Sequence, residues 1–175
     1  MSDQSLSSVL EIVWQHLSRG TADRHHPARH PTLATISPDG PDLRTLVLRC
    51  VDRETSTLEF HTDSASPKTA HIAENPAIAI HVWIPKARLQ IRARGTARLV
   101  AGDAKLFDRL PEQAQANYTG PIPGTPLPTD TPNTPPRFAR LLCVLSEIDA
   151  LILSDPHQRG LFTSAKDWQG AWIAP

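Results

Sequence analysis

The sequence predicts a mainly β domain of the α+β class, in which a strand-rich barrel carries a few flanking helices. Three observations lead to this prediction. Short apolar runs bounded by turn residues recur over residues 32–100 and again from residue 138. Strands and helices do not alternate in the rhythm that parallel βαβ folds require. At 175 residues the chain is long enough for one core and short for two, so we expect one domain, residues 1–175.

The first element is expected to be an amphipathic helix over residues 5–18. Apolar side chains recur there at helical spacing, and Ser5 is suited to cap the start. Gly20 is suited to end the helix, because glycine adopts the left-handed conformation that closes many helices. We expect the apolar side of this helix to pack on a sheet.

Residues 21–31 contain three histidines and are interpreted as a polar surface loop. A zinc site is the alternative. It is disfavoured because no cysteine is close and because two adjacent histidines on a strand point to opposite sides. The three side chains are those of His25, His26 and His30.

Two strands joined by a tight turn are expected next, over residues 32–37 and 43–52. The turn at residues 37–40 has proline and glycine where such a turn needs them. The second strand begins and ends near two arginines, Arg44 and Arg49, which lie five apart and therefore leave opposite faces. Alternation predicts that Leu46, Leu48 and Cys50 share one face of this strand and that Thr45, Val47 and Arg49 share the other.

A third strand over residues 57–62 is expected to lead through a short loop into a helix. Ser66 is suited to the N-cap of that helix and Pro67 to its first position. Lys68 follows in the first turn, where a positive charge opposes the helix dipole. A bound anion would explain this lysine, because free backbone N–H groups at a helix start favour negative charge. The alternative is an ordinary capped helix with an exposed lysine.

The remaining elements are read from the same signals. The helix that begins at Ser66 is expected to end near residue 75, and a short hairpin-like piece is expected around residues 161–162. The other expected elements are strands over residues 77–84, 88–100 and 138–153, a helix over residues 103–117, and a Pro-rich loop or arm over residues 119–136. That arm holds seven prolines and two glycines, and it either covers a site or partner or is a mobile surface loop.

The strand over residues 88–100 alternates between a polar and an apolar face. Leu89, Ile91 and Ala93 are expected to face the core. The opposite face is expected to carry Gln90, Arg92 and Arg94. Gln90 offers both a donor and an acceptor, which suits the polar edge of a ring ligand. The two arginines are expected to form salt bridges or a subunit contact.

Composition excludes several classes of function. Eighteen basic residues balance eighteen acidic ones, so no charge pattern supports binding to nucleic acid or to an anionic membrane. No apolar run approaches the roughly 20 residues that span a bilayer. The N-terminus lacks the features of a signal peptide, and the cysteines, Cys50 and Cys143, lie in apolar runs typical of buried thiols. We therefore expect a cytoplasmic protein.

Four short motifs occur in an order and spacing that resemble the flavin-binding core of the pyridoxamine 5'-phosphate oxidase-like family. They are Arg44-Thr-Leu-Val-Leu-Arg49, His61-Thr62, Ser66-Pro-Lys68 and Gln90-Ile-Arg92-Ala-Arg94-Gly95. No single motif is specific, but four in register over about fifty residues are. The resemblance covers residues 32–100 and resumes from His157 to the C-terminus.

The resemblance implies an FMN-binding split β-barrel that forms a homodimer, with FMN at the subunit interface. It implies that Arg44, Lys68 and Ser66 hold the phosphate. The backbone from Thr45 to Leu48 would lie along the ring. The other residues implied to contact the cofactor are Leu46, Val47, Arg49, His61, Thr62, Gln90 and Arg159. The residues implied to contact the substrate are Arg49 and His157.

The chain departs from the oxidase pattern where the substrate would bind. Pro67 replaces a basic residue, and Asp155 stands where an arginine is expected and would repel a phosphate. The oxidase Tyr…Arg…Ser set is not evident over residues 106–111. The sequence therefore favours an FMN-dependent oxidoreductase that transfers hydride to or from a small molecule other than pyridoxamine phosphate, with no catalytic side chain assigned. The alternatives are a non-catalytic flavin-binding or electron-carrier protein, or a protein of this fold that uses haem or a deazaflavin.

Overall fold

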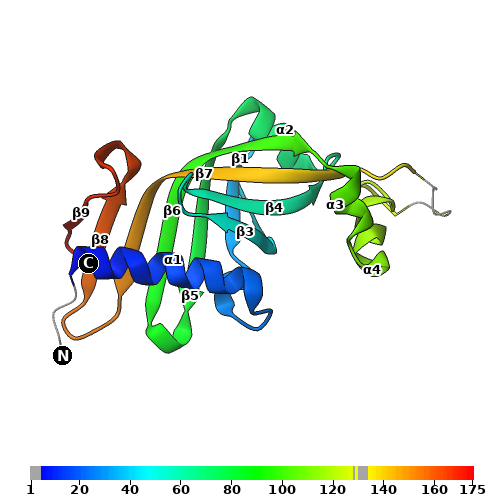
Figure 1. The fold of residues 1–175 in the computed structure, drawn as a ribbon. Helices are drawn as coiled ribbons and strands as arrows, with labels where there is room; N and C mark the ends of the chain where they lie inside the picture. The colour runs from blue at the N-terminus through cyan, green and yellow to red at the C-terminus, as the bar shows by residue number, and fades with distance from the viewer. Residues whose placement is uncertain (1–4, 128, 130–133) are drawn as a thin grey trace.

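The computed structural model describes residues 5–127, 129 and 134–175, and one antiparallel sheet dominates that part of the chain (Figure 1). Its main path has the strand order β2-β1-β5-β6-β7-β4-β3, and β8 and β9 extend it from β7. The strands are β1 (Thr32–Ser37), β2 (Gly40–Thr45), β3 (Leu48–Asp52), β4 (Thr57–Asp63), β5 (Ala77–Ile84), β6 (Leu89–Ala101), β7 (Phe138–Ile152), β8 (Gln158–Thr163) and β9 (Gly170–Trp172). The predicted mainly β class is confirmed.

One long helix, α1, and several short helices accompany the sheet in the described residues. The α-helices are α1 (Leu6–Ala22), α2 (Pro67–Glu74), α3 (Ala104–Asp108) and α4 (Glu112–Gln115). The 3₁₀ helices are η1 (Pro27–Arg29), η2 (Pro85–Ala87), η3 (Ala116–Tyr118) and η4 (Ser164–Lys166). Within the described residues, no helix combines the length and the apolar character that a bilayer crossing requires.

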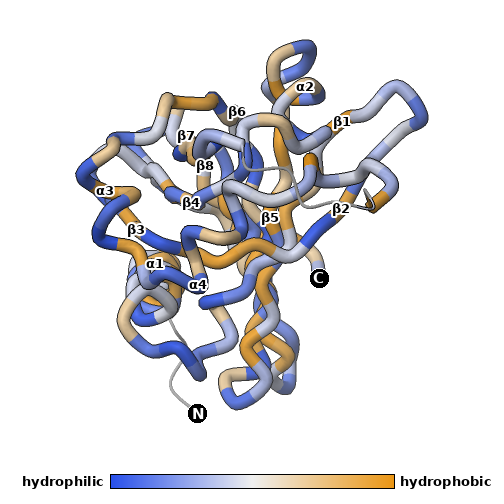
Figure 2. The backbone as a smooth tube through the Cα atoms, turned by 90° about the vertical axis from the view of Figure 1, so that its right-hand side faces the viewer, coloured by the Kyte–Doolittle hydropathy of each residue, from blue (hydrophilic) through white to orange (hydrophobic). Residues whose placement is uncertain are grey.

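The core forms between α1 and the inner face of the sheet. Every second residue of β5 is buried, and β6 alternates in the same way from Leu89 to Arg94, as its sequence predicts. Figure 1 shows α1 lying across the strands, and its apolar stripe is buried at Val9, Val13, Trp14 and Leu17. Figure 2 shows the hairpin tip between β1 and β2 as hydrophilic, away from this core.

Helix α1 is longer than predicted because Gly20 does not end it. Gly20 lies inside the helix, and a Cβ at this position would meet the backbone carbon of Ala28 at 2.6 Å. The glycine therefore allows η1 to approach the helix closely, and the helix ends at Ala22 with Asp23 as its cap. The predicted N-cap is confirmed, since the Ser5 hydroxyl accepts the N–H of Ser8 at 3.2 Å.

The interpretation of residues 21–31 as a polar surface loop is wrong for one histidine. His26 is 7% exposed and stacks on His16 of α1, with 3.1 Å between the Nδ1 of His16 and the Nε2 of His26. The other ring nitrogen of His26 accepts the N–H of Ala28 at 3.2 Å and caps η1. Contact with His16 of α1, which lies ten residues earlier in the chain, buries this side chain.

The single strand predicted over residues 43–52 is two strands. The chain leaves β2 after Thr45 and enters β3 at Leu48, and the connecting Leu46 donates its N–H to Pro31 O at 3.1 Å. A β-bulge between Leu48 and Cys50 then shifts the register against β4. Because a bulge adds one residue, Leu48 is buried whereas Cys50 points to the other face and is exposed. The predicted burial is wrong for Cys50 and confirmed for Cys143.

Two other predicted elements differ from the structure. The helix expected over residues 103–117 is divided into α3, α4 and η3, with Pro111 at the N-cap of α4. Proline lacks an N–H and cannot continue the preceding helix. The described residues of the Pro-rich segment, 119–127, 129 and 134–136, contain no helix or strand, as predicted; its residues 128 and 130–133 lie outside the described part.

Candidate functional site

The ammonium group of Lys68 lies among hydroxyl groups at the start of α2. Its Nζ donates to Thr62 Oγ1 at 3.2 Å and to Ser66 Oγ, and no ion pair to a carboxylate within 4 Å is found for it in the described residues. Burial lowers the pKa of Lys68, and the charge of nearby Arg44 lowers it further. Two cations thus share one region. An anion bound between them would relieve their repulsion.

Arg44 reaches the same region from the edge strand β2. Its Nη1 donates to Thr35 Oγ1 at 2.7 Å and to Leu33 O at 3.4 Å, and its Nη2 pairs with Asp42. The Arg44 side chain is 17% exposed, whereas that of Asp42 is 46% exposed. His71 of α2 lies 3.7 Å from Asp42 and ties the hairpin to the helix. The structure therefore brings Arg44, Lys68, Thr62 and Ser66 together.

The start of α2 lacks the side-chain cap that the sequence predicts. Ser66 occupies the N-cap position, but its hydroxyl accepts a hydrogen bond from Lys68 instead of from the helix backbone. Pro67 takes the first helical position as predicted. An uncapped helix start beside two cations and two hydroxyls is the donor set that a phosphate monoester needs, so these residues fit the phosphate of FMN.

Two buried polar atoms on β3 and β4 lack hydrogen-bond partners in the described part of the chain. They are the Nε of Arg49 and the Nδ1 of His61. The His61 side chain is 7% exposed, packs edge-on against Phe138, and places its Nε2 3.4 Å from Glu59. Burial and the charge of Arg49 lower the pKa of His61, which favours the neutral ring. Because Nε2 faces a carboxylate, it carries the proton, and Nδ1 remains an acceptor.

Gln90 and Arg159 occupy the opposite, outer face of the sheet. Gln90 pairs across to Leu151, which pairs to Arg159, and this row alternates with the core row of Ile91 and Ala150. By contrast, Arg44 pairs with Leu33 in a core row. The described contacts of one chain therefore do not join Gln90 or Arg159 to Arg44 and Lys68.

Arg159 is already bonded to a carboxylate. Its Nε and Nη2 donate to the two oxygens of Asp149 at 3.0 and 2.9 Å, and Arg92 pairs with the same group. Arg94 lies 3.8 Å from Glu147, so the predicted salt bridges of both β6 arginines are confirmed. His157 is exposed in the turn before β8, where its Nδ1 lies 2.6 Å from Ser154 O.

Sequence reasoning missed several residues that shape the site. Thr35 and Asp42, which bind Arg44, are direct partners in the β1–β2 register. The turn at residues 37–40 was a usable signal for them, because the turn sets the register. Arg137, which binds Asp63 at the end of β4, carries no local signal.

Comparison with known proteins gives a consistent result. The family model described as "Pyridoxamine 5'-phosphate oxidase, FMN-binding domain" matches residues 11–101, just over half of the chain. A pyridoxine/pyridoxamine 5'-phosphate oxidase of Rhodopseudomonas palustris (strain TIE-1) is 38% identical over 87 residues, which are 47% of this chain and 40% of the relative. One from Ralstonia nicotianae is 38% identical over 72 residues, which are 41% of this chain and 33% of the relative. The matches thus span well under half of the length of these oxidases.

Solved structures share the fold over almost the whole chain. A pyridoxamine 5'-phosphate oxidase-related FMN-binding protein of Nostoc punctiforme PCC 73102 superposes with a TM-score of 0.77 at 28% identity, covering 94% of this chain and 96% of that one. PhzG from Burkholderia lata 383 superposes with a TM-score of 0.76 at 17% identity, covering 95% and 92%, which shows the fold alone. The predicted split-barrel fold is confirmed.

Proposed function

The chain belongs to the pyridoxamine 5'-phosphate oxidase FMN-binding domain family, and from this premise we propose that it is an FMN-dependent oxidoreductase acting on a small molecule. The observation that carries the proposal is that two cations, Lys68 and Arg44, lie close together beside two hydroxyls at an uncapped helix start. When bound, FMN supplies the redox chemistry, because its ring exchanges a hydride with the substrate.

The residues of the chain bind and orient the cofactor. Lys68 and Arg44 neutralise the phosphate, and the Ser66 and Thr62 hydroxyls, which now accept from Lys68, can turn to donate to phosphate oxygens. Residues 46 and 47 interrupt the strand between β2 and β3, and the backbone from Thr45 to Leu48 is proposed to lie along the ring.

Arg49 and His61 are proposed to contact the ring or the substrate. One offers a buried donor and the other a buried acceptor, and both lack partners in the described residues. Unpaired buried groups cost about 1–3 kcal/mol each, which a bound ligand would recover. Asp155 and His157 flank the turn before β8, and the acidic Asp155 disfavours a phosphorylated substrate, so we propose an unphosphorylated one.

A homodimer with FMN at its interface is proposed as the working assembly. In one chain the sheet separates Gln90 and Arg159 from Lys68, so a second copy is needed to bring them to the same cofactor. The outer face supports this, because it exposes Leu43 (61%), Ile36 (45%) and Trp83 (39%). A groove of about 250 Å³ on that face is lined by Leu43, His81, Arg92, Asp149 and neighbouring residues.

Titration with FMN, followed by quenching of flavin fluorescence, tests the proposal. We expect saturable binding at one FMN per chain, and a mass in solution of twice the chain mass. Lys68→Ala should weaken FMN binding about 10- to 100-fold, since a charge-assisted hydrogen bond contributes about 1.5–3 kcal/mol. Riboflavin, which lacks the phosphate, should bind the wild type and the variant equally.

The exposed Lys105→Ala serves as the matched control and should leave FMN binding unchanged. Absence of FMN binding by the wild-type protein would overturn the proposal. Saturable binding with no reduction of the flavin by any small-molecule or nicotinamide donor would instead support a non-catalytic flavin-binding protein.

A further inference from the structure

We infer that Arg137, at the end of the Pro-rich segment, is a positioning residue for the phosphate end of the site, acting through Asp63. The inference rests on the proposed function, because it takes Lys68 and Ser66 to be phosphate ligands. Arg137 itself is placed to shape the loop from Asp63 to Ser66 that presents them, without touching the phosphate.

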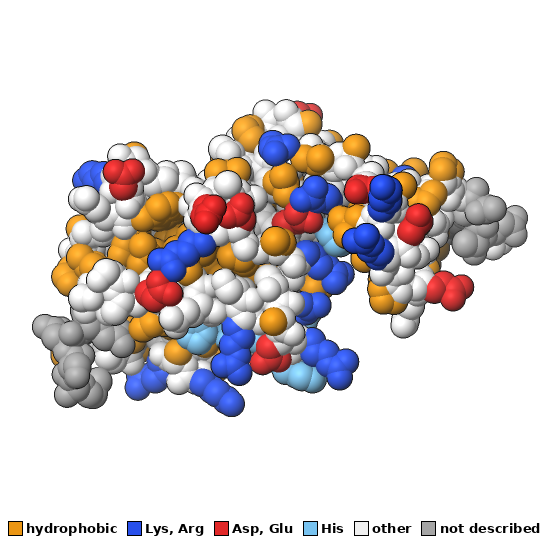
Figure 3. Space-filling model, in the orientation of Figure 1, with side chains coloured by type: hydrophobic (Ala, Val, Ile, Leu, Met, Phe, Trp, Pro, Cys, Tyr) orange, Lys and Arg blue, Asp and Glu red, His pale blue; other side chains and the backbone are white. Residues whose placement is uncertain are grey.

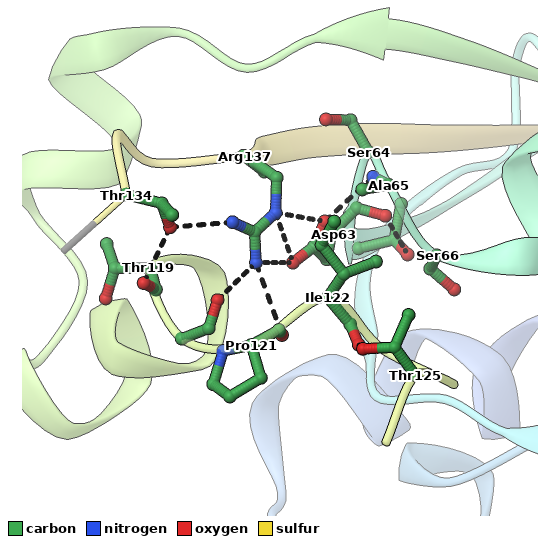
Figure 4. Close-up of polar contacts among 12 residues, drawn as sticks. Asp63, Ser64, Ala65, Ser66, Thr119, Pro121, Ile122, Thr125, Thr134 and Arg137 are labelled. Carbon is green, nitrogen blue, oxygen red and sulfur yellow. Dashed lines mark hydrogen bonds and ion pairs between the residues drawn. The ribbon is translucent and has the colours of Figure 1, made fainter. Parts of the chain in front are cut away.

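The guanidinium of Arg137 donates hydrogen bonds from two nitrogens to the carboxylate of Asp63 (Figure 4). Its Nε lies 3.1 Å from each carboxylate oxygen, and its Nη2 lies 2.9 Å from Oδ2. Asp63 in turn accepts the N–H of Ala65 at 2.8 Å and, through its backbone O, the N–H of Ser66 at 3.1 Å. The backbone O of Arg137 accepts the N–H of Ser64 at 2.7 Å. The loop is therefore held at three successive residues before Lys68.

The remaining donors of Arg137 hold the Pro-rich segment. Nη2 also donates to Gly120 O at 2.7 Å and to Pro121 O at 3.4 Å, and Nη1 donates to Thr134 Oγ1 at 2.7 Å (Figure 4). Gly124 also lies near the start of α2, since a Cβ at this position would be 3.2 Å from Pro67 Cγ. One side chain thus joins the segment to the loop that begins α2.

The charge of Arg137 also matters to an anion nearby. Asp63 is 6% exposed, and it acts on the pKa of Lys68, which places its negative charge within electrostatic reach of the lysine. An unpaired carboxylate there would compete with a phosphate for Lys68 and would repel it. The bidentate pair with Arg137 neutralises Asp63 and leaves Lys68 to the ligand.

The test compares Arg137→Lys with a matched control, Arg29→Lys. Lysine keeps the positive charge at 137 but cannot reproduce the planar fork that joins Asp63 to two carbonyls. Arg29 likewise holds two backbone carbonyls, Thr21 O at 3.0 Å and Gly20 O at 3.4 Å, but in α1. We expect Arg137→Lys to weaken FMN binding about tenfold while riboflavin binding stays the same, and Arg29→Lys to change neither.

A second readout uses the ligand-free protein. Amide hydrogen exchange of residues 64–69 should be faster in Arg137→Lys than in the wild type and unchanged in Arg29→Lys. Equal FMN affinity and equal exchange in Arg137→Lys and wild type would overturn the inference, as would equal losses for FMN and riboflavin. Wild-type protein that binds no FMN overturns the proposed function, and the phosphate role of Arg137 with it.

Asp63→Asn provides an independent variant should Arg137→Lys fold poorly. The asparagine keeps an oxygen that can accept the N–H of Ala65 but removes the negative charge that pairs with Arg137. The inference predicts weaker FMN binding, because the loop loses its anchor. If Asp63 acted only by repelling the phosphate, the variant would bind FMN more tightly, and that result would overturn the inference.

Discussion

Two clusters of basic side chains in this protein differ in the groups that their side chains contact. At the start of α2, Lys68 bonds only to hydroxyls among its described partners, and Arg44 pairs with a half-exposed Asp42. On the outer face of the sheet, Arg92 and Arg159 both bond to Asp149, which is 6% exposed. Figure 3 shows basic and acidic side chains interspersed on the face that it draws, so neither cluster stands out by charge alone.

The difference lies in what already satisfies the cations. A buried carboxylate that receives two arginines satisfies them within the protein, and such a cluster stabilises the sheet. Cations that contact only neutral hydroxyls keep a charge that no carboxylate neutralises, and burial raises the free-energy cost of that charge. Basic residues that look equivalent in a motif therefore divide into structural and ligand-ready groups only when their partners are known.

The largest effect is expected from removing the shared carboxylate of the outer cluster. Asp149→Ala should lower the free energy of unfolding by about 2–3 kcal/mol, because two arginines lose charge-assisted hydrogen bonds and one of them, Arg159, is three-quarters buried. Urea unfolding at fixed protein concentration measures this. Asp149→Asn, which keeps an acceptor, should lose less, and a loss for Asp149→Ala within error of zero would remove the structural role from this cluster.

The same carboxylate should make stability depend on pH. Burial alone would raise the pKa of Asp149, but hydrogen bonds from Arg159 and Arg92 outweigh it and hold the pKa below its usual range. The stabilisation is thus present above the unfolded-state value of about 4 and is lost as pH falls below it. The difference in unfolding free energy between wild type and Asp149→Asn should shrink on going from pH 6 to pH 3.

An intermediate effect is expected from the titration of Lys68. Burial and Arg44 lower its pKa, and only the protonated form attracts a phosphate. FMN affinity should therefore fall as pH rises through that lowered pKa, at a pH below the ordinary lysine value, with a limiting slope of about tenfold per pH unit. Dissociation constants measured from pH 7 to pH 10 test this.

Lys68→Arg is the control for that series, because arginine does not titrate in this range. Its FMN affinity should change less with pH than that of the wild type. Parallel curves for the two proteins would show that another group causes the pH dependence.

The smallest effect is expected at Arg94, which lies on the same face as Arg92 but is 73% exposed and 3.8 Å from Glu147. An exposed pair of this kind contributes little, so Arg94→Ala should change the free energy of unfolding by less than about 0.5 kcal/mol. Urea unfolding beside Asp149→Ala gives a direct comparison. A loss as large as that of Asp149→Ala would contradict the distinction between buried and exposed partners.

Much of the fold could be predicted from local patterns. The alternation of the first half of β6, the turn before β2, and Ser5 and Pro67 at helix starts all depend on a few neighbouring residues, and the structure confirms them. The errors occur where a distant segment intervenes. Gly20 admits Ala28, and the bulge against β4 turns Cys50 outward.

The candidate site shows the same division. Arg44, Ser66 and Lys68 could be selected from motif order, and the structure brings them together, although their role toward FMN stays a prediction. The contacts that leave these residues available to a ligand could not be predicted from the sequence. The Ser66 hydroxyl accepts a hydrogen bond from Lys68 instead of capping α2, and Asp63 is neutralised by an arginine 74 residues away.

The sequence by itself determined which residues alternate toward a core, where turns interrupt them and which motifs relate the chain to a flavin-binding family. These properties follow from backbone periodicity and side-chain chemistry, which act over a few residues. The tertiary structure alone decided which cations are satisfied and which face of the sheet each one occupies. Burial and charge pairing depend on side chains that only strand pairing brings within a few ångströms, such as Asp149 with Arg92 across 57 positions.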